Sequence, residues 1–83
     1  MSATVADVVR SRIDLHRDTI TCLLRVQQVA NEVKRETSDL RELIAVAGII
    51  DDLDKSIERH QREMQRLSRS RLLKDYAEAR WNP

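Results

Sequence analysis

The chain has 83 residues, of which 41% are hydrophobic and 35% are charged, and its formal net charge is +1. The chain has one glycine, one proline and only two aromatic residues (one Trp and one Tyr), so residue types typical of turns and packed sheets are scarce. This composition favours long helices. At this length we expect one small domain, for which oligomerisation is a common source of stability.

The single cysteine and the N-terminal residues bear on where the chain is found. Cys22 has no second cysteine for an intrachain disulfide, so we expect a buried thiol in a reducing compartment. Residues 1–12 lack the basic and apolar regions of a secretory signal. The longest apolar run, residues 43–50, is too short for a bilayer span, which needs roughly 20 residues. We therefore expect a cytoplasmic protein without membrane insertion.

Apolar residues recur with helical spacing from Val5 to Tyr76, and each half of the chain has one heptad-like seam. The first seam comprises Val9, Ile13, His16, Ile20, Leu23, Gln27 and Ala30, and then drifts onto Val33. The second seam comprises Leu43, Ala47, Ile50, Leu53, Ile57, His60, Met64 and Leu67, with a slip of one residue. Two long helices, each with one apolar edge, are therefore predicted.

A turn at Thr37-Ser38 brings the two seams into register. Layer partners then have numbers that add up to about 76, so that Val9 faces Leu67. Ser38 or Thr37 can cap the second helix, and Asp39 suits its first turn. The prediction is an all-α antiparallel helical hairpin.

The whole chain forms a single domain in this prediction. Its parts are a helix over 4–36, a turn at 37–38, a helix over 39–79 and a frayed tail at 80–83. Tyr76 and Trp81 lie near the C-terminal end, where aromatic residues often anchor an interface. Two interpretations stay open there, a recognition tip and a frayed or capping end of the bundle.

Gly48 offers a rival position for the break. Glycine commonly follows the end of a helix, and Asp51 can cap the next one, which would give a longer first helix or three helices. Apolar residues flank Gly48 on both sides, however, and the two seams then match less well. With the break at Thr37-Ser38, Gly48 becomes a close-approach or kink point inside the second helix, at a cost of about 1 kcal/mol relative to alanine.

Further apolar residues lie outside the two seams. In the first helix they form a second heptad-like stripe, and the run at 43–50 is apolar on nearly all sides. The predicted protein interface comprises Val8, Leu15, Cys22, Val26, Val29, Val33, Ile44, Val46 and Ile49. Because one partner helix cannot cover so wide a face, we expect the hairpin to dimerise into a four-helix bundle or to dock on a helical protein partner.

Five basic residues follow the second helix with steps of four and three residues, opposite its seam. They are Lys55, Arg59, Arg62, Arg66 and Arg69. The row is about 21 Å long at 1.5 Å per residue, so it can follow a phosphate backbone. A dimer would present two such rows to duplex RNA or DNA. The competing interpretation is a solvated face on which Glu58 and Glu63 form helical ion pairs.

Little in the sequence points to catalysis. There is no glycine-rich phosphate loop, and the two histidines and Cys22 lack the spacing of a metal site. The acidic run at 51–54 lacks the loop pattern of a calcium site. We therefore expect a non-enzymatic interaction or assembly module (oligomerisation, adaptor or chaperone-like subunit) with no cofactor, metal or small-molecule substrate. Binding of duplex RNA or DNA is the alternative.

A histidine interrupts each seam. The proposed register places His16 opposite His60, between apolar layers. Two neutral imidazoles can share a hydrogen bond, and a polar layer of this kind fixes register at some cost in stability. Two charged rings would repel, so stability is predicted to fall as the pH falls through about 6. The alternative is that one or both rings lean outward into solvent.

Overall fold

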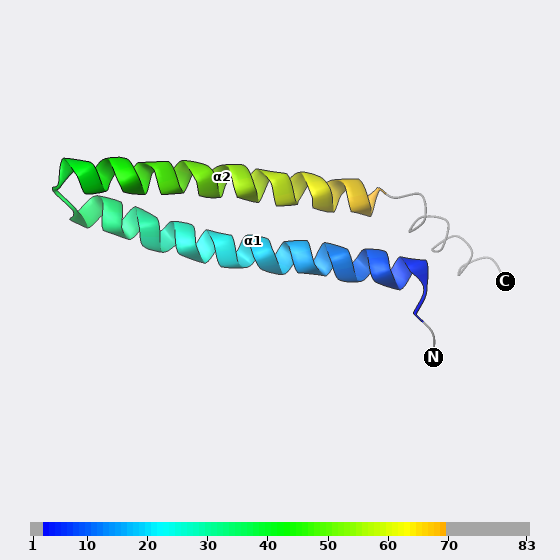
Figure 1. Cartoon of the computed structure of the whole chain (residues 1–83). Coiled ribbons are helices and arrows are strands. Elements are labelled where there is room, and N and C mark those ends of the chain that lie inside the picture. The colour runs from blue at the N-terminus through cyan, green and yellow to red at the C-terminus, as the bar shows by residue number, and fades with distance from the viewer. Residues whose placement is uncertain (1–2, 70–83) are drawn as a thin grey trace.

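The computed structural model describes residues 3–69, which form two long α-helices joined by a short turn (Figure 1). Helix α1 runs Val5–Glu36 and helix α2 runs Leu40–Ser68. The two helices lie side by side in opposite directions, and residues 3–69 contain no strand. The predicted all-α fold with two packed helices is confirmed. The predicted helix beyond residue 69, with Tyr76, Trp81 and the tail, lies outside the described residues.

The start of α1 is fixed by a reciprocal pair of hydrogen bonds. The Thr4 hydroxyl accepts from the Asp7 backbone N–H at 3.1 Å, and the Asp7 carboxylate accepts from the Thr4 backbone N–H at 3.0 Å. This capping box satisfies two donors that the first turn leaves without a helical partner. The hydrogen bonds from the Thr4 backbone and hydroxyl hold the pKa of Asp7 below its usual value.

The turn occupies Thr37, Ser38 and Asp39, and α2 continues without a break through Gly48. The cap of α2 is Asp39, which accepts from the backbone N–H groups of Arg41 at 2.8 Å and Glu42 at 3.4 Å. The prediction that Ser38 or Thr37 caps this helix is therefore wrong by one or two residues. An aspartate reaches the same two donors that a serine would, so the sequence did not distinguish them.

The core is a narrow seam between the two helices. Among residues 3–69 only Ala6, Ile20 and Ile57 are buried. The half-buried seam residues are Val9, Ile13, His16, Leu23, Gln27 and Ala30 in α1 and Leu43, Val46, Ile50, Leu53, His60, Met64 and Leu67 in α2. Two helices cannot enclose each other, so the hairpin leaves much of its apolar surface in contact with water.

The observed seam differs from the predicted one at its ends. Val46 is half-buried and Ala47 is exposed, so the steps of the second seam alternate between three and four residues with no slip. The first seam begins one step earlier, at buried Ala6, and Val33 is 43% exposed. An uninterrupted apolar run such as 43–50 has no polar residue to mark its outer side, which explains the error there.

Gly48 is an ordinary position inside α2. A Cβ atom built on Gly48 meets no atom within 4 Å, so the expectation of a close-approach point is wrong for the described hairpin. No glycine or other residue in the described range has a positive φ. The backbone at Gly48 therefore does not require glycine.

Candidate interaction surface

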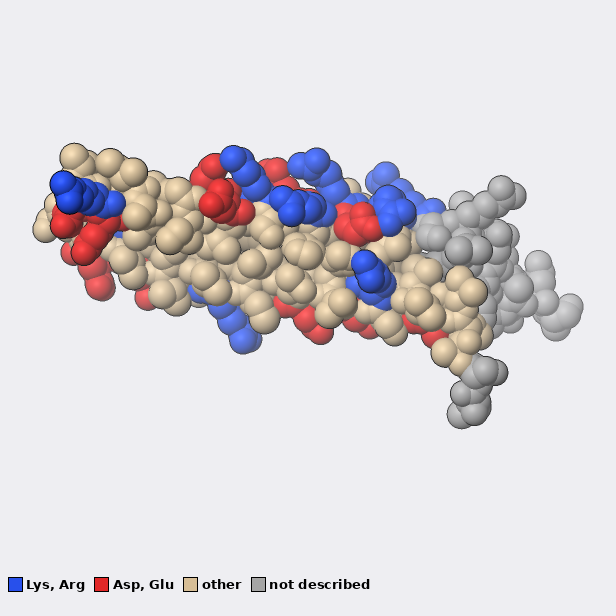
Figure 2. Space-filling model, in the orientation of Figure 1, with Lys and Arg blue, Asp and Glu red and all other residues tan. Residues whose placement is uncertain are grey.

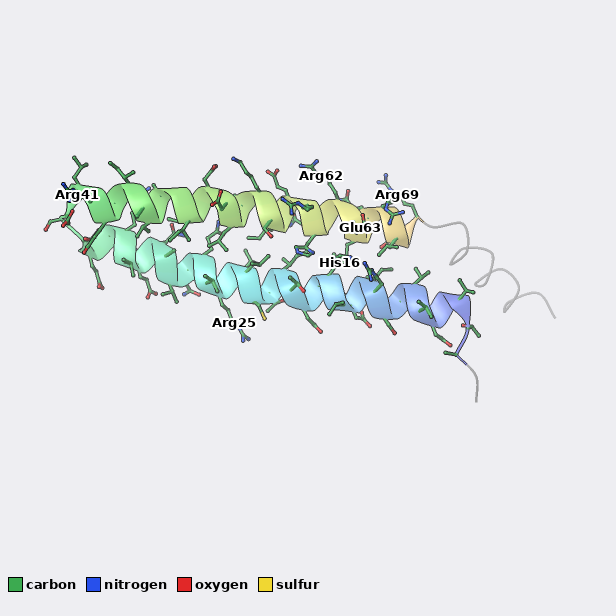
Figure 3. All side chains as sticks on the ribbon, in the orientation of Figure 1. His16, Arg25, Arg41, Arg62, Glu63 and Arg69 are labelled. Carbon is green, nitrogen blue, oxygen red and sulfur yellow. The ribbon has the colours of Figure 1, made fainter. Side chains whose placement is uncertain are left out.

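His16 and His60 meet between the two helices. Their Nδ1 atoms are 2.8 Å apart, and their ring centroids are 5.0 Å apart with the planes tilted by 50°. Figure 3 shows His16 reaching from α1 toward α2. At this separation one Nδ1 donates a proton and the other accepts it. The structure thus brings together the two residues of the predicted polar layer.

One ring nitrogen of His16 is left unsatisfied. Its Nε2 atom is buried and has no hydrogen-bond partner within residues 3–69. A buried polar atom without a partner costs about 1–3 kcal/mol. The histidine pair therefore contributes more to selecting one register of the two helices than to the stability of the hairpin. In the described part of the chain, no group of three or more His, Cys, Asp or Glu residues could hold a metal ion.

A second polar contact crosses the seam nearer the turn. Gln27, a half-buried seam residue of α1, donates a hydrogen bond from its side-chain amide to the Asp54 carboxylate of α2. The contacts of Gln27 and His16 lie about 16 Å apart along α1, at 1.5 Å per residue. Together they fix the axial position of one helix against the other, and so they fix which outer side chains share a face.

One flank of α1 carries a second complete heptad pattern, which we call the α1 outer stripe. It comprises Val5, Val8, Arg12, Leu15, Thr19, Cys22, Val26, Val29 and Val33. Its steps alternate between three and four residues over four heptads, which is the spacing of a coiled-coil seam. Its valine and leucine residues are 43–62% exposed. Neither α1 nor α2 has an apolar stretch that would let it cross a membrane, within the described residues.

The predicted interface residues do not all lie on this stripe. The six predicted residues in α1 do, and each of them is exposed. Cys22 is among them, so the expectation of a buried thiol is wrong for the hairpin. Val46 is half-buried in the seam of α2. Ile44 and Ile49 are 66% and 50% exposed, but one follows a seam residue and the other precedes one, so they fall on opposite flanks of α2.

Electrostatics identifies the flank of α2 that adjoins the α1 outer stripe. Glu63, which precedes a seam residue as Ile49 does, interacts with the charge of Arg12 in the stripe. Hydrogen bonds from Arg66 hold the pKa of Glu63 below its usual value, partly opposed by desolvation and supported by the charges of Arg66, His16 and Arg12. Arg12 and Glu63 therefore lie on one face of the hairpin.

This flank of α2 repeats with the same heptad spacing, and we call it the α2 flank. It comprises Ala45, Ile49, Asp52, Ser56, Arg59, Glu63 and Arg66. Whereas the α1 outer stripe is mostly apolar, the α2 flank is mostly polar. In Figure 2 the charged side chains gather along the α2 edge, and most of the visible surface of α1 is uncharged.

Two exposed leucines were absent from the predicted interface. Leu24 and Leu40 are 50% and 70% exposed. Leu24 follows a seam residue, so it lies on the flank of α1 opposite to the outer stripe, and Leu40 opens α2. Neither continues a heptad pattern of apolar residues, and periodicity therefore gave no signal for them. Val5, in contrast, lies three residues before Val8, so extending the heptad spacing of the α1 outer stripe toward the N-terminus would have found it.

The predicted basic stripe is exposed along α2, and Figure 3 shows Arg62 and Arg69 pointing away from α1. Three of its five members form ion pairs: Lys55 with Asp51 at 2.9 Å, Arg62 with Glu58 at 3.4 Å, and Arg66 with Glu63. The hydrogen bond to Asp51 raises the pKa of Lys55. Arg59 and Arg69 form no ion pair within residues 3–69. The row is thus partly neutralised, as expected for a solvated helical face.

By these features the molecule is a two-helix hairpin whose seam contains two polar contacts and whose first helix carries an exposed apolar stripe. Comparison with protein-family models, with curated proteins and with solved structures gives no match for this chain.

Proposed function

We propose that this chain is a non-enzymatic interaction module that assembles through the α1 outer stripe. The observation that carries the proposal is the stripe itself, a four-heptad seam of which the valine and leucine members remain 43–62% exposed. Such regularity is typical of a surface that another helix covers, because scattered apolar residues need not repeat every three and four positions.

The hairpin on its own has a small core, which also supports the proposal. It buries only three side chains in the described range. Removing the exposed half of a valine or leucine side chain from water contributes on the order of 1 kcal/mol. Covering the stripe with another helix would therefore add stabilisation comparable to that of a small domain. We propose that the covering helices come from a second hairpin, which yields a four-helix bundle.

Sedimentation equilibrium over a wide concentration range tests this proposal. The wild-type chain is expected to change from a mass of 9.7 kDa to twice that value as its concentration rises. Val26→Lys places a charge in the stripe and is expected to weaken association at least about tenfold. Leu24→Lys is the matched control, because Leu24 is 50% exposed and Val26 is 51% exposed, on opposite flanks of α1.

Two results would contradict the proposal. A wild-type chain that keeps the mass of one copy at every concentration would exclude self-assembly. Equal weakening by Val26→Lys and Leu24→Lys would show that the stripe is not the associating surface. Circular dichroism of both variants establishes that the hairpin itself is still helical.

Duplex RNA or DNA binding through the basic stripe has less support. Ion pairs with Asp51, Glu58 and Glu63 already neutralise three of its five cations. A phosphate backbone would have to displace these carboxylates before it gained the same contacts. The sedimentation experiment repeated with duplex RNA at low salt distinguishes the two functions, because only nucleic-acid binding adds the mass of the duplex to that of the protein.

A further inference from the structure

We infer that two hairpins pack face to face about a two-fold axis that passes Thr19 of α1 and Ser56 of α2. Helix α1 then pairs antiparallel with α1 of the second copy, and α2 with its own counterpart. This inference rests on the proposed function, because it specifies how the same surface meets its partner. The contacting face combines the α1 outer stripe with the α2 flank.

The α1 outer stripe is complementary to itself when two copies run in opposite directions. Its members lie 4, 7, 11 and 14 residues before Thr19 and 3, 7, 10 and 14 residues after it, so the two sides match to within one residue. With Thr19 on the axis, the apolar pairs are Val5 with Val33, Val8 with Val29, and Leu15 with Cys22 of the second copy. A two-fold contact requires that a surface match its own inverted copy, and this stripe does so over four heptads.

One of the two polar members of the stripe, Thr19, is already satisfied inside the hairpin. The Thr19 hydroxyl donates to the Leu15 backbone oxygen at 2.8 Å. Arg12 interacts with the charge of Glu63 on the neighbouring helix. Covering Thr19 therefore leaves no lone hydroxyl, and the charge of Glu63 offsets part of the charge of Arg12. The aliphatic part of Arg12 would lie against Val26 of the second copy.

The same axis determines the contacts of α2. His16 and His60 lie at one level of the hairpin, and three or four residues toward the turn along each helix places Thr19 level with Ser56. Ser56 is half-buried and has a small side chain, which suits a position on the axis. The two-fold rotation then brings Asp52 opposite Arg59 of the second copy, and the same contact forms a second time between Arg59 and Asp52 of the second copy.

Asp52 and Arg59 have no ion-pair partner within residues 3–69, whereas most of the neighbouring cations on α2 do. The proposed dimer supplies each of them with an oppositely charged partner in the second copy. Two symmetric ion pairs of this kind would set the orientation of the hairpins more than they would add to affinity. Apolar contacts between the α1 helices supply the affinity.

The other two-fold arrangement of these faces is less favourable. An axis parallel to the helices would place the α1 outer stripe on the α2 flank of the second copy. Leu15 would then lie against Arg59 and Cys22 against Asp52, so that apolar side chains would cover charged ones. The proposed axis keeps most apolar residues of the α1 outer stripe together and pairs Asp52 with Arg59, while it also sets Ile49 against Glu63 of the second copy.

Disulfide formation in a glutathione redox buffer tests the position of the axis. Thr19→Cys in a Cys22→Ser background is expected to yield a covalent dimer, because the two thiols face each other across the axis. Wild-type Cys22 lies six residues from its symmetry mate along the seam, about 9 Å, and is expected to cross-link weakly. Leu24→Cys in the Cys22→Ser background is the control and is expected to remain monomeric on a non-reducing gel.

A charge exchange tests the α2 contact in the same dimer. Asp52→Arg is expected to weaken association at least about tenfold at low salt, and adding Arg59→Asp is expected to restore it to within about threefold. Asp51→Arg makes the same charge change one residue away, about 100° round the helix, and is expected to leave association unchanged.

The outcomes separate this inference from the proposed function. A dimer by sedimentation that cross-links through wild-type Cys22 as readily as through Thr19→Cys overturns the axis and leaves the proposed function standing. Failure of the double charge exchange to restore association overturns the α2 contact. Absence of any dimer in the wild-type chain overturns both the inference and the proposed function.

Discussion

At the scale of single residues, the seam is governed by the contact between His16 and His60. Their facing Nδ1 atoms, 2.8 Å apart, accommodate one proton between them. Glu63 carries a negative charge that interacts with His16, and Arg12 lies close enough to interact with Glu63. Two protonated rings would place two N–H donors and two positive charges face to face.

The histidine pair predicts a pH dependence of folding. Because the 2.8 Å contact between the two Nδ1 atoms needs one donor and one acceptor, it is lost when both rings are charged, and the free energy of unfolding is expected to decrease in acid. Urea titrations from pH 8 to pH 5 measure this loss. The double variant His16→Leu/His60→Leu keeps every carboxylate and is expected to lose that part of the pH dependence.

The single variants complete this test. Each leaves one imidazole without its partner in the seam and is expected to lower the free energy of unfolding at pH 7.5 by about 1–3 kcal/mol. The double variant replaces a polar layer by an apolar one and is expected to be at least as stable as the wild type. Identical pH profiles for the wild type and the double variant would contradict a role for the pair.

At the scale of the helices, the sequence was informative wherever polar residues marked the outer side of a seam. The order of steps in the two seams predicted the hairpin and placed His16 opposite His60. Where polar markers are missing, as in residues 43–50, the pattern failed and Ala47 was taken for a seam residue in place of Val46. Ion pairs such as Lys55 with Asp51 depend on rotamers, which spacing alone does not determine.

The α1 outer stripe was predicted only in part for a related reason. Its apolar members have heptad spacing, but Val5 lies near the start of the chain and the interface prediction stopped at Val8. Cys22 was expected to be buried because free cysteines usually are. That expectation considers the residue type and not the flank of the helix on which it falls, and the hairpin leaves this flank uncovered.

Gly48 provides a test of the second helix. It lies inside α2, away from both ends, and an added Cβ meets no atom within 4 Å. Gly48→Ala is therefore expected to raise the free energy of unfolding by about 1 kcal/mol, because alanine loses less backbone entropy on forming a helix. Chemical denaturation of the two proteins at one concentration measures the difference. A loss of stability would show that another chain approaches the backbone at Gly48.

At the scale of the whole molecule, the hairpin is an incomplete core. Three buried side chains hold two helices of 32 and 29 residues together, while a second seam of comparable length faces solvent. Pairing two copies through that seam would give every long helix two antiparallel neighbours, as in a four-helix bundle. The polar contacts of His16 and Gln27 would then determine which side chains each copy presents to the other.

The most direct test of the α1 outer stripe uses the native thiol that lies on it. Cys22 is exposed in the hairpin, so iodoacetamide should alkylate it rapidly in dilute, reduced protein. We expect alkylation to slow at least about tenfold over the concentration range in which sedimentation shows the mass doubling. A rate that stays constant while the mass doubles would exclude the α1 outer stripe as the interface, because the chains would then associate through a surface that leaves the stripe uncovered.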